Sequence, residues 1–545
     1  MRKRPLIIVI GTLAVALIAA GAVSGQRSRS ASGGVFRLGT SSRIDSLNPY
    51  VAFNQDAYST FMYVYPYLVQ YDKRLRFAPD FGRSWKVSKD GKTWTFKTAA
   101  NAKWSDGQPL TAADAAWTLN TNVKYQSTGA AAYAGLVAHL KRAEAPNPTT
   151  LIVRYAAPVG NVLSQLEQIP ILPKHVWSKY TGHKGKDLKT YANNAPVVSG
   201  GAFVLTKYKK DQIALLERNE DFYGPKPQAD GFGLRMFSND DAMIAALKAG
   251  EIDGVEAVPP TAIAAVRKAG LVVAEGPGIS MADFIINSNP KKPKHRELLD
   301  LRVKEAFAHA IDRKKIADVV WLGTAKPAAS FIPPATGLWH DPLKPETFSV
   351  ALANRILDRA GYKKGSDGIR VAGDHKMAYE VIDPTDVQSI PRTFQIIQAD
   401  FAKIGVKLTL KPLDSSAAFD AITAPNTKYL NFDLAMWSWT ALIDPDFMLS
   451  VLTCAQYGGW SDSGYCNAEY DRMYAKQGVT VSVAKRRKIV WEMQAKISRE
   501  RPYIILNWQD VVYAHSKKWT GFVDSPQGPF NSLSKQSLSE VHQVG

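Results

Sequence analysis

The chain contains little cysteine, since only Cys454 and Cys466 occur among its 545 residues. A structural zinc site needs four ligands, usually cysteines and histidines, and this pair has no matching histidines, so no zinc site is expected. The two cysteines flank a loop rich in glycine and serine. In a chain exported from the cytoplasm, a disulfide that closes this loop is favoured over two free thiols.

The chain also lacks the short signatures of common enzyme classes. It has no Gly-x-Ser-x-Gly elbow, no His-Glu-x-x-His, no P-loop and no Gly-x-Gly-x-x-Gly. We therefore expect no catalytic residue, no metal and no cofactor, although its many Asp and Glu residues leave a glycosidase-like pair untested. The 13 Trp and 22 Tyr favour recognition without bond making, because they give a cleft flat apolar surface with polar tips.

A basic arm or stripe is missing as well. The formal net charge is +19, but the lysines and arginines are scattered along the chain. Binding to nucleic acid would require them to gather on one surface, so no nucleic-acid partner is expected. The basic residues either form an ordinary solvated surface or attract the protein to an anionic cell envelope. The compact basic clusters are Lys207-Lys209-Lys210, Lys291-Lys292-Lys294 and Lys485 to Lys488.

The first residues are typical of an export signal. Arg2-Lys3-Arg4 precedes the apolar run 6–20, which ends in small residues near Ala22. Residues 1–25 are therefore expected to be a signal peptide or an N-terminal membrane anchor, since the run 6–23, of about 18 residues, barely spans a bilayer. No cysteine follows for a lipid anchor, and residues 26–34 are expected to form a flexible tether. The protein is expected outside the cytoplasm, either secreted or tethered to the outer face of the membrane.

The pattern of the remaining chain predicts a mixed α/β protein. Its length predicts two or three packed units. Val303, Phe307 and Ile311 share one face of a predicted helix, and a second amphipathic helix ends at Gly405 before an alternating strand. A further helix is expected before Pro502, followed by an apolar strand over 503–508.

The segment 85–117 carries closely spaced turn and cap signals. Asp90-Gly91 predicts the turn of a β-hairpin, and a second turn is expected at Asp106-Gly107. Thr111 stands three residues before Asp114, which predicts a capping box at the start of a helix. Taken alone, these signals also fit a generic hairpin, turn and helix.

This segment resembles the extracellular solute-binding proteins of family 5, the peptide, nickel and oligosaccharide receptors of ABC importers. Further segments resemble that family in its order along the chain, although Ala202-Phe203 replaces the family's usual Pro-Tyr. These segments are Asp45 to Pro49, Ser199 to Phe203, Leu216 to Asn219, Ala246 to Asp253, Arg302 to Arg313, Leu357 to Tyr362 and Ile404 to Leu410. The resemblance implies the type II fold of periplasmic binding proteins, with two lobes, a cleft between them and an extra inserted domain.

Domain boundaries follow from the positions of these segments. The expected first lobe comprises residues 33–78, 199–285 and 511–545, the inserted domain residues 79–198, and the second lobe residues 286–510.

The resemblance also suggests a ligand site in the segment 432–449. Family peptide receptors use an aspartate here to pair with the ammonium of the ligand, but this chain has Ala441 at that position. Burying an ammonium without a counter-charge costs several kcal/mol, so a free N-terminus is expected to be poorly recognised unless Asp444 or Asp446 replaces the missing aspartate. The alternative is that both aspartates cap the helix that follows.

Further candidates flank the expected cleft. Trp437 and Trp439 share one face of a strand, so they are expected to form an aromatic platform for a sugar ring or aromatic side chain, or else to pack in the core. The resemblance places Tyr50, Asn54 and Gln55 near the rim of the first lobe. Asn287 follows an apolar strand, where it is expected to bond either the ligand or a turn.

These features together predict a monomeric receptor that delivers an oligopeptide-like solute to the permease subunits of an ABC transporter. Closure needs a ligand that touches both lobes, because only differential affinity shifts a hinge equilibrium. An oligosaccharide is the second candidate solute. A secreted hydrolase and a signalling or scaffolding receptor are the alternatives from other classes.

Overall fold

The computed structural model describes residues 33–545 except 53, 386, 388, 527, 530–534 and 545. The expected signal or anchor, residues 1–25, and residues 26–32 of the expected tether lie outside the described residues. Among the helices of the described part, none combines the length and the apolar character needed to cross a bilayer.

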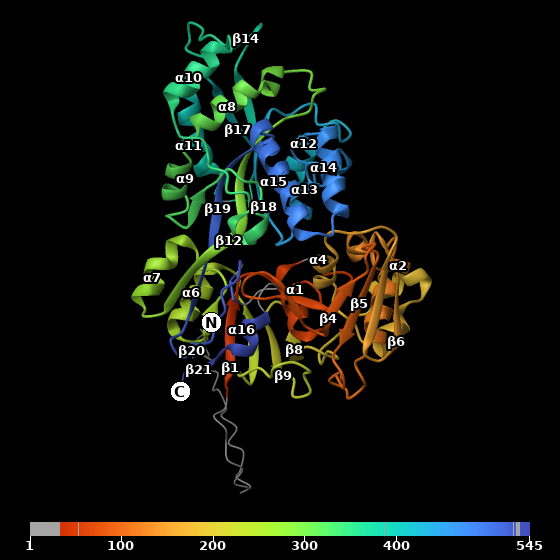
Figure 1. The fold of residues 1–545 in the computed structure, drawn as a ribbon. Helices are drawn as coiled ribbons and strands as arrows, with labels where there is room; N and C mark the ends of the chain where they lie inside the picture. Colours follow the sequence, from red (N-terminus) through yellow and green to blue (C-terminus); the bar gives the residue numbers. More distant parts are fainter. Residues whose placement is uncertain are drawn as a thin grey trace, which may run out of the picture. The chain divides into compact units, whose positions relative to one another are not determined.

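Eleven strands of the described residues form one large mixed sheet (Figure 1). Ten of them follow the order β17-β16-β18-β12-β19-β11-β1-β10-β9-β8, and β13 pairs with β19 at the side. Their bounds in that order are Lys407–Leu413, Ala378–Pro384, Leu434–Thr440, Val272–Ile286, Tyr503–His515, Gly254–Val255, Val35–Thr40, Gly231–Met236, Ile213–Arg218 and Phe203–Lys209, with β13 at Ala325–Pro327. The mixture of parallel and antiparallel pairs agrees with the predicted α/β class.

Strands β12 and β19 are the longest of this sheet, and they run antiparallel to each other along most of their length. At one end β19 pairs with β11, and at the other end β12 pairs with β18. Their register shifts between Pro277 and Met281. A proline has no amide proton for the ladder, and an irregularity of this kind bends a strand, so this point is a natural place for flexion.

The buried apolar residues divide at these two strands. Two clusters of buried apolar residues lie within residues 36–266 and 512–541. Two other clusters lie within residues 279–508. We refer to the first pair of clusters and its elements as the first lobe, and to the second pair as the second lobe. The exact boundaries of the lobes stay a prediction.

The segment that carried the turn and cap signals folds as expected. Strands β4 (Gly82–Val87) and β5 (Thr93–Thr98) form a hairpin whose turn residue Gly91 has a φ of +71°, a conformation that favours glycine. Thr111 and Asp114 make the predicted capping box of helix α2 (Ala112–Lys124). With β7 (Thr150–Tyr155) and β6 (Leu140–Asn147), the hairpin forms a four-stranded antiparallel sheet that packs into the core of the first lobe.

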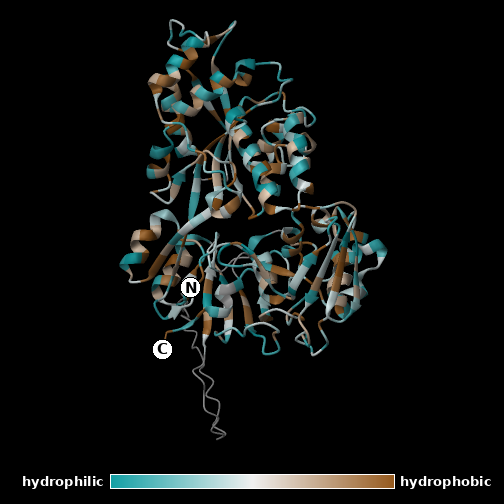
Figure 2. Ribbon diagram, in the orientation of Figure 1, coloured by the Kyte–Doolittle hydropathy of each residue, from teal (hydrophilic) through white to brown (hydrophobic). Residues whose placement is uncertain are grey.

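In the second lobe, helices pack on both faces of the sheet. One face carries α8 (Leu301–Ala310), α10 (Val350–Arg359) and α11 (Ile390–Lys403), and the other carries α12 (Ser415–Thr423), α13 (Asp446–Ser450), α14 (Ala468–Val479) and α15 (Val483–Glu500). Figure 2 shows teal and brown residues on the same helices, as expected of helices that bury one face only. The predicted stripe of Val303, Phe307 and Ile311 is buried. The predicted helix before Gly405 is α11, and Gly405 has a φ of +77°.

Candidate functional site

A cavity of about 600 Å³ is lined by residues from both lobes. Its volume lies within the range of about 300–1,000 Å³ that is usual for small-molecule sites. From the first lobe it is lined by Gln55, Tyr58, Met62, Tyr67, Val69, Gln70, Tyr71, Ala132, Tyr133, Gly135, Leu136, Ser164, Glu167, Gln168 and Lys535. From the second lobe it is lined by Leu442, Ile443, Asp444, Phe447 and Trp460. A solute in this cavity would therefore contact both lobes at once.

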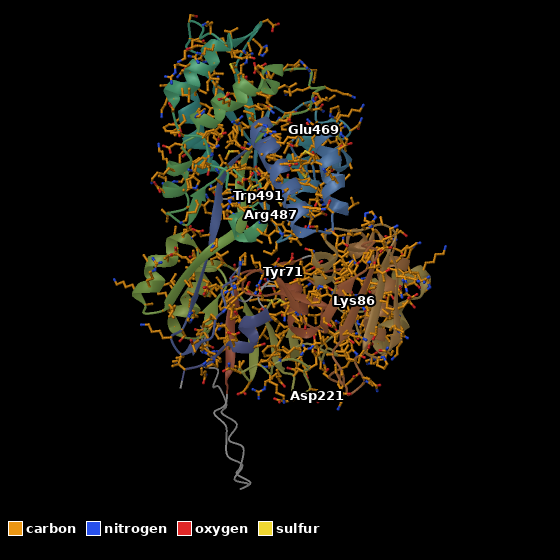
Figure 3. All side chains as sticks on the ribbon, viewed as in Figure 1. Tyr71, Lys86, Asp221, Glu469, Arg487 and Trp491 are labelled. Carbon is orange, nitrogen blue, oxygen red and sulfur yellow. A yellow bond between two sulfur atoms is a disulfide. The ribbon has the colours of Figure 1, made fainter. Side chains whose placement is uncertain are left out.

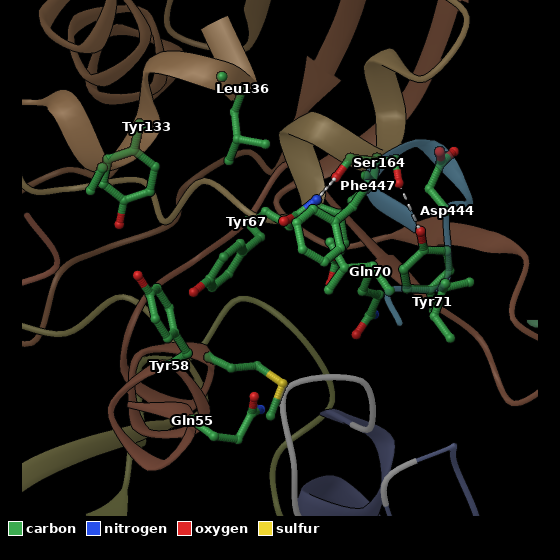
Figure 4. Close-up of a pocket in the computed structure, with 18 of the residues that line it drawn as sticks. Gln55, Tyr58, Tyr67, Gln70, Tyr71, Tyr133, Leu136, Ser164, Asp444 and Phe447 are labelled. Carbon is green, nitrogen blue, oxygen red and sulfur yellow. Dashed lines mark hydrogen bonds between the residues drawn. The ribbon is translucent and has the colours of Figure 1, made fainter. Parts of the chain in front are cut away.

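Four tyrosines dominate the wall contributed by the first lobe. Tyr58 lies on α1 (Gln55–Val64), Tyr71 ends β2 (Val69–Tyr71), Tyr67 precedes β2, and Tyr133 ends a single helical turn. Figure 4 shows Tyr58, Tyr67 and Tyr133 pointing toward a common space. Tyr58 and Tyr133 donate their hydroxyl protons to the carbonyls of Ala52 and Pro49, each at 3.0 Å, so their oxygens remain available as acceptors.

The wall contributed by the second lobe comes from two segments that lie after β18, residues 442–447 and Trp460. Phe447 of α13 and Trp460 make an edge-to-face contact with ring centroids 5.6 Å apart. Trp460 lies in the loop closed by the disulfide between Cys454 and Cys466, so the predicted disulfide is present. Trp460 is 56% exposed, which leaves much of its indole free to contact a solute.

Asp444 lines the cavity, but its charge is already matched. Both of its carboxylate oxygens accept from the guanidinium of Arg486, at 2.6 and 2.7 Å, and both side chains are buried. Arg486 also donates to Gln477 at 2.8 Å and lies over the ring of Trp339. The structure therefore places Asp444 in a buried ion pair that holds the segment in front of the cavity.

Asp446 is not among the residues that line the cavity. It is the first residue of α13, whose N-cap is Pro445, and its carboxylate accepts from the side-chain amide of Gln477 at 2.7 Å. Burial, followed by the charge of Asp444, raises the pKa of Asp446. The alternative that both aspartates cap this helix holds in part. Asp444 accepts a hydrogen bond from the backbone amide of Asp446 at 3.0 Å, at the start of α13.

Trp437 and Trp439 lie behind the cavity wall and do not line it. Both are partly buried on β18 and pack against the core of the second lobe. Trp439 contacts Phe447 and Trp460, with ring centroids 6.0 and 6.4 Å apart, and donates its indole proton to Asp462 at 3.1 Å. Trp439 thus supports the aromatic pair that does line the cavity, and the role of Trp437 and Trp439 as a ligand platform stays a prediction.

The remaining candidates are divided between the cavity and the interior. Gln55 lines the cavity. Tyr50 is buried against Tyr133 and Trp177, and Asn54 precedes α1 and donates to the carbonyl of Arg43 at 3.3 Å.

Asn287 is fully buried and serves a turn. Its amide donates to the carbonyls of Tyr429 and Phe432 at 3.0 and 2.8 Å, and its oxygen accepts from the amide of Asn289. Of the eight predicted ligand residues, the structure thus brings Gln55 and Asp444 to the cavity.

Comparison with known proteins assigns the family. Residues 76–459 match the bacterial extracellular solute-binding proteins, family 5. The chain belongs to this family. Protein XP55 of Streptomyces lividans is similar, with 26% identity over 517 residues that cover 93% of this chain and 90% of that protein.

Solved structures share the fold of this family 5 chain. The ABC transporter substrate-binding protein CtaP from Listeria monocytogenes matches with a TM-score of 0.79 at 21% identity, covering 94% of this chain and 100% of that chain. The oligopeptide-binding protein AppA from Bacillus subtilis, solved with a nonapeptide, matches with a TM-score of 0.73 at 21% identity, covering 94% and 99%. These neighbours confirm the predicted two-lobed, type II binding-protein fold.

Sequence reasoning missed most of the residues that line the cavity of this family 5 protein. These residues come from α1, from β2 and the residues before it, from the helical turn Ala131–Tyr133 and from helix α4 (Val162–Glu167), and they include Tyr58, Tyr67, Tyr71, Tyr133 and Glu167. The density of tyrosines between residues 58 and 71 was the one available signal. It pointed to aromatic surface but not to the side of the fold on which that surface lies.

A buried acid pair lies beneath the second-lobe wall. Asp283 of β12 is completely buried, and no donor reaches either of its oxygens with hydrogen-bond geometry within the described residues. Burial, followed by the charge of Asp462, raises the pKa of Asp283 well above its usual value, although the nearby amide of Trp437 opposes the rise. Asp462 accepts from Tyr503 and Trp439, and burial raises its pKa to about 7. We therefore expect at least one proton to be shared by this pair in the folded protein.

This pair predicts a loss of stability as the pH rises. Above about pH 4 the unfolded chain releases the proton of Asp283, whereas the folded chain keeps it, so the free energy of unfolding falls as pH rises to 7 and beyond, by up to about 1.4 kcal/mol per pH unit for one group. Asp283→Asn removes this titration. We expect its melting temperature to depend less on pH between 4 and 8 and to exceed that of the wild type at pH 8. Asp221→Asn, which removes an exposed carboxylate (Figure 3), should keep the wild-type slope, and equal slopes in all three proteins would contradict the prediction.

Proposed function

We propose that this chain is the substrate-binding receptor of an ABC importer and that it captures an oligopeptide-like solute in the cavity between its lobes. The observation that carries this proposal is the composition of the cavity wall, with residues from both lobes. A ligand that contacts both lobes favours the closed form, because its affinity for that form is higher. The permease subunits would then recognise the closed receptor and take over the solute.

The long strands β12 and β19 supply the connection that such closure needs. Both pass from one set of core clusters to the other, and their register shifts between Pro277 and Met281. We infer that the lobes rotate about this point. A contact between the lobes supports a closed arrangement, since the amide of Gly160 donates to the carbonyl of Gly478 at 2.7 Å.

An oligopeptide is favoured by the relatives and by the shape of the site. The AppA structure that shares this fold was solved with a nonapeptide. The tyrosine oxygens described above accept hydrogen bonds from peptide amides, and the apolar rings accommodate varied side chains. An oligosaccharide is the second candidate, because the exposed Trp460 and the four tyrosines also suit sugar rings.

We propose binding without catalysis, an extracytoplasmic location that follows from the family, and a monomeric receptor that is either secreted or tethered through its N-terminus. Calorimetry with a pool of tri- to pentapeptides and with a panel of oligosaccharides tests the assignment. We expect saturable heat at a 1:1 ratio with peptides and none with sugars. Saturable heat with sugars alone would overturn the peptide assignment, and cleavage of either ligand would overturn the proposal of a receptor without catalysis.

A further inference from the structure

Glu167 is the charged residue of the cavity wall whose charge is left unmatched. Asp444 is paired with Arg486, and the ammonium of Lys535 is bonded to Asp80 and lies 4.2 Å from the centroid of the Tyr67 ring. Glu167 ends helix α4 (Val162–Glu167), and within the described residues its carboxyl group makes neither a hydrogen bond nor an ion pair.

The surroundings of Glu167 disfavour a bare negative charge. Burial raises its pKa to about 8, the charge of Asp80 adds to the rise, and the ammonium of Lys535 opposes it. The other titratable groups that interact with it are the hydroxyls of Tyr67 and Tyr71. Below about pH 8 the empty site therefore holds a neutral carboxyl group, and a cation arriving in the cavity would favour its ionised form.

The neighbouring aromatic rings favour a positive charge at the same place. The faces of tyrosine rings attract cations, and the contact of Lys535 with Tyr67 shows that this wall already accommodates one ammonium group. In the second lobe, Ala441 precedes the lining residue Leu442, is buried and carries no charge. The first lobe thus offers a carboxyl group without an ion-pair partner, whereas the carboxylate that the second lobe brings to the cavity, Asp444, is paired with Arg486.

We propose that Glu167 binds a primary ammonium group of the solute and so selects solutes that carry one. This inference rests on the proposed receptor function. It assigns to Glu167, in the first lobe, the negative charge that this chain lacks at Ala441. The ammonium has two sources in a peptide, namely the α-amino group and a lysine side chain, and both would make the same contact with the carboxylate.

The test compares peptide pools that differ in whether they carry an ammonium group and where it lies. The purified chain is incubated with a pool of tripeptides with free α-amino groups and no lysine, with the same pool after N-acetylation, and with an N-acetylated pool that contains lysine. Captured peptides are identified by mass spectrometry and titrated singly. Capture of the first pool points to the α-ammonium, and capture of the third points to the lysine side chain.

The variant Glu167→Gln keeps the shape of the side chain and removes its charge. Glu167 is half-buried, and a bound solute would cover it. Truncating one partner of a buried charge pair usually costs 2–5 kcal/mol, so we expect at least about a 30-fold loss of affinity for the ammonium peptides. We expect no loss for the neutral pool, and Glu167→Asp should restore part of the affinity. Glu492→Gln, which alters an exposed carboxylate of α15, is the control and should bind as the wild type does.

The number of protons released on binding distinguishes this role of Glu167 from a merely structural one. Because the empty site holds a neutral carboxyl group, binding of an ammonium at pH 6.5 should release close to one proton, which calorimetry in two buffers measures. Affinity for a lysine-bearing peptide should rise with pH until about pH 8. Glu167→Gln should release no proton and should show no such rise.

Two results would overturn the inference while leaving the receptor function intact. One is equal affinity of the wild type for the neutral pool and the ammonium pools, and the other is unchanged affinity of Glu167→Gln for ammonium peptides. Failure to capture any pool would instead count against an oligopeptide solute. In that case benzylammonium is compared with benzyl alcohol, and equal binding of the two by the wild type overturns the role of Glu167.

Discussion

Replacing Arg486 by methionine is expected to lower the free energy of unfolding by about 3–5 kcal/mol. The guanidinium is buried, donates twice to Asp444 and once to Gln477, and stacks on Trp339. Methionine fills much of the same volume but leaves the carboxylate of Asp444 buried without a partner. Denaturation by urea, followed by tryptophan fluorescence, measures the loss.

Two further variants show whether the charge pair or the packing is responsible. Arg487 is the next residue of α15, is exposed and lies over the ring of Trp491 (Figure 3). We expect Arg487→Met to cost no more than about 1 kcal/mol. The double variant Arg486→Met with Asp444→Leu should recover most of the stability, because the carboxylate that Arg486 neutralised is then removed as well. If Arg486→Met and Arg487→Met cost the same, the buried pair does not stabilise the wall of the site.

Placing a tryptophan at Gly135 is expected to weaken binding of the solute by about 100-fold. Gly135 lies in the short helix α3 (Ala134–Val137), is exposed, and lines the cavity from the first lobe. A Cβ atom built at this glycine would meet no atom within 4 Å, and its φ lies outside the left-handed region. The new indole should therefore occupy the cavity without disturbing the fold.

The size of the effect follows from overfilling a site of fixed shape. Overpacking costs about 1–3 kcal/mol in a protein core, which corresponds to a loss of affinity of up to about 150-fold. We expect about a 100-fold loss for every member of the peptide pool, with an unfolding free energy within about 0.5 kcal/mol of the wild type. Gly135→Ala is the matched control and should bind normally. Wild-type affinity in Gly135→Trp would show that the solute binds elsewhere.

Local patterns in the sequence were sufficient to predict much of the fold. The hairpin around Gly91, the capping box at Thr111 and Asp114, and the helix that ends at Gly405 depend on residues that are close in sequence. Turn geometry, capping and amphipathic periodicity are local physical requirements, so they can be read from a single chain. The family resemblance added the two-lobed architecture, which no local pattern contains.

The site was harder to predict because its walls come from distant segments. Asp444 was expected to be free for a ligand, but its partner Arg486 lies 42 residues further along the chain and reaches it only through the packing of α15. Trp439 has the expected position on β18, yet Phe447 and Trp460 lie in front of it. Period-two spacing gives the face of a strand but does not reveal which neighbours cover that face.

The burial of Tyr50 and Asn287 illustrates the same limit. Tyr50 follows a segment that resembles the family, Asn287 follows an apolar strand, and both have polar groups suited to a ligand. Tyr50 packs instead against Tyr133, which itself lines the cavity, and Asn287 bonds two carbonyls of a turn. A polar residue near a cleft often supports the wall, and only the three-dimensional contacts distinguish this role from ligand binding.

Native mass spectrometry of the protein after incubation with the tripeptide pool tests the central claim most directly, because it measures the mass of the solute while it is bound. We expect one added mass per chain, equal to that of an intact peptide, in the wild type and in Gly135→Ala, and none in Gly135→Trp. An unoccupied wild-type chain, fragments of the peptides in solution, or an equal added mass in Gly135→Trp would contradict the account of an unaltered solute held between two lobes.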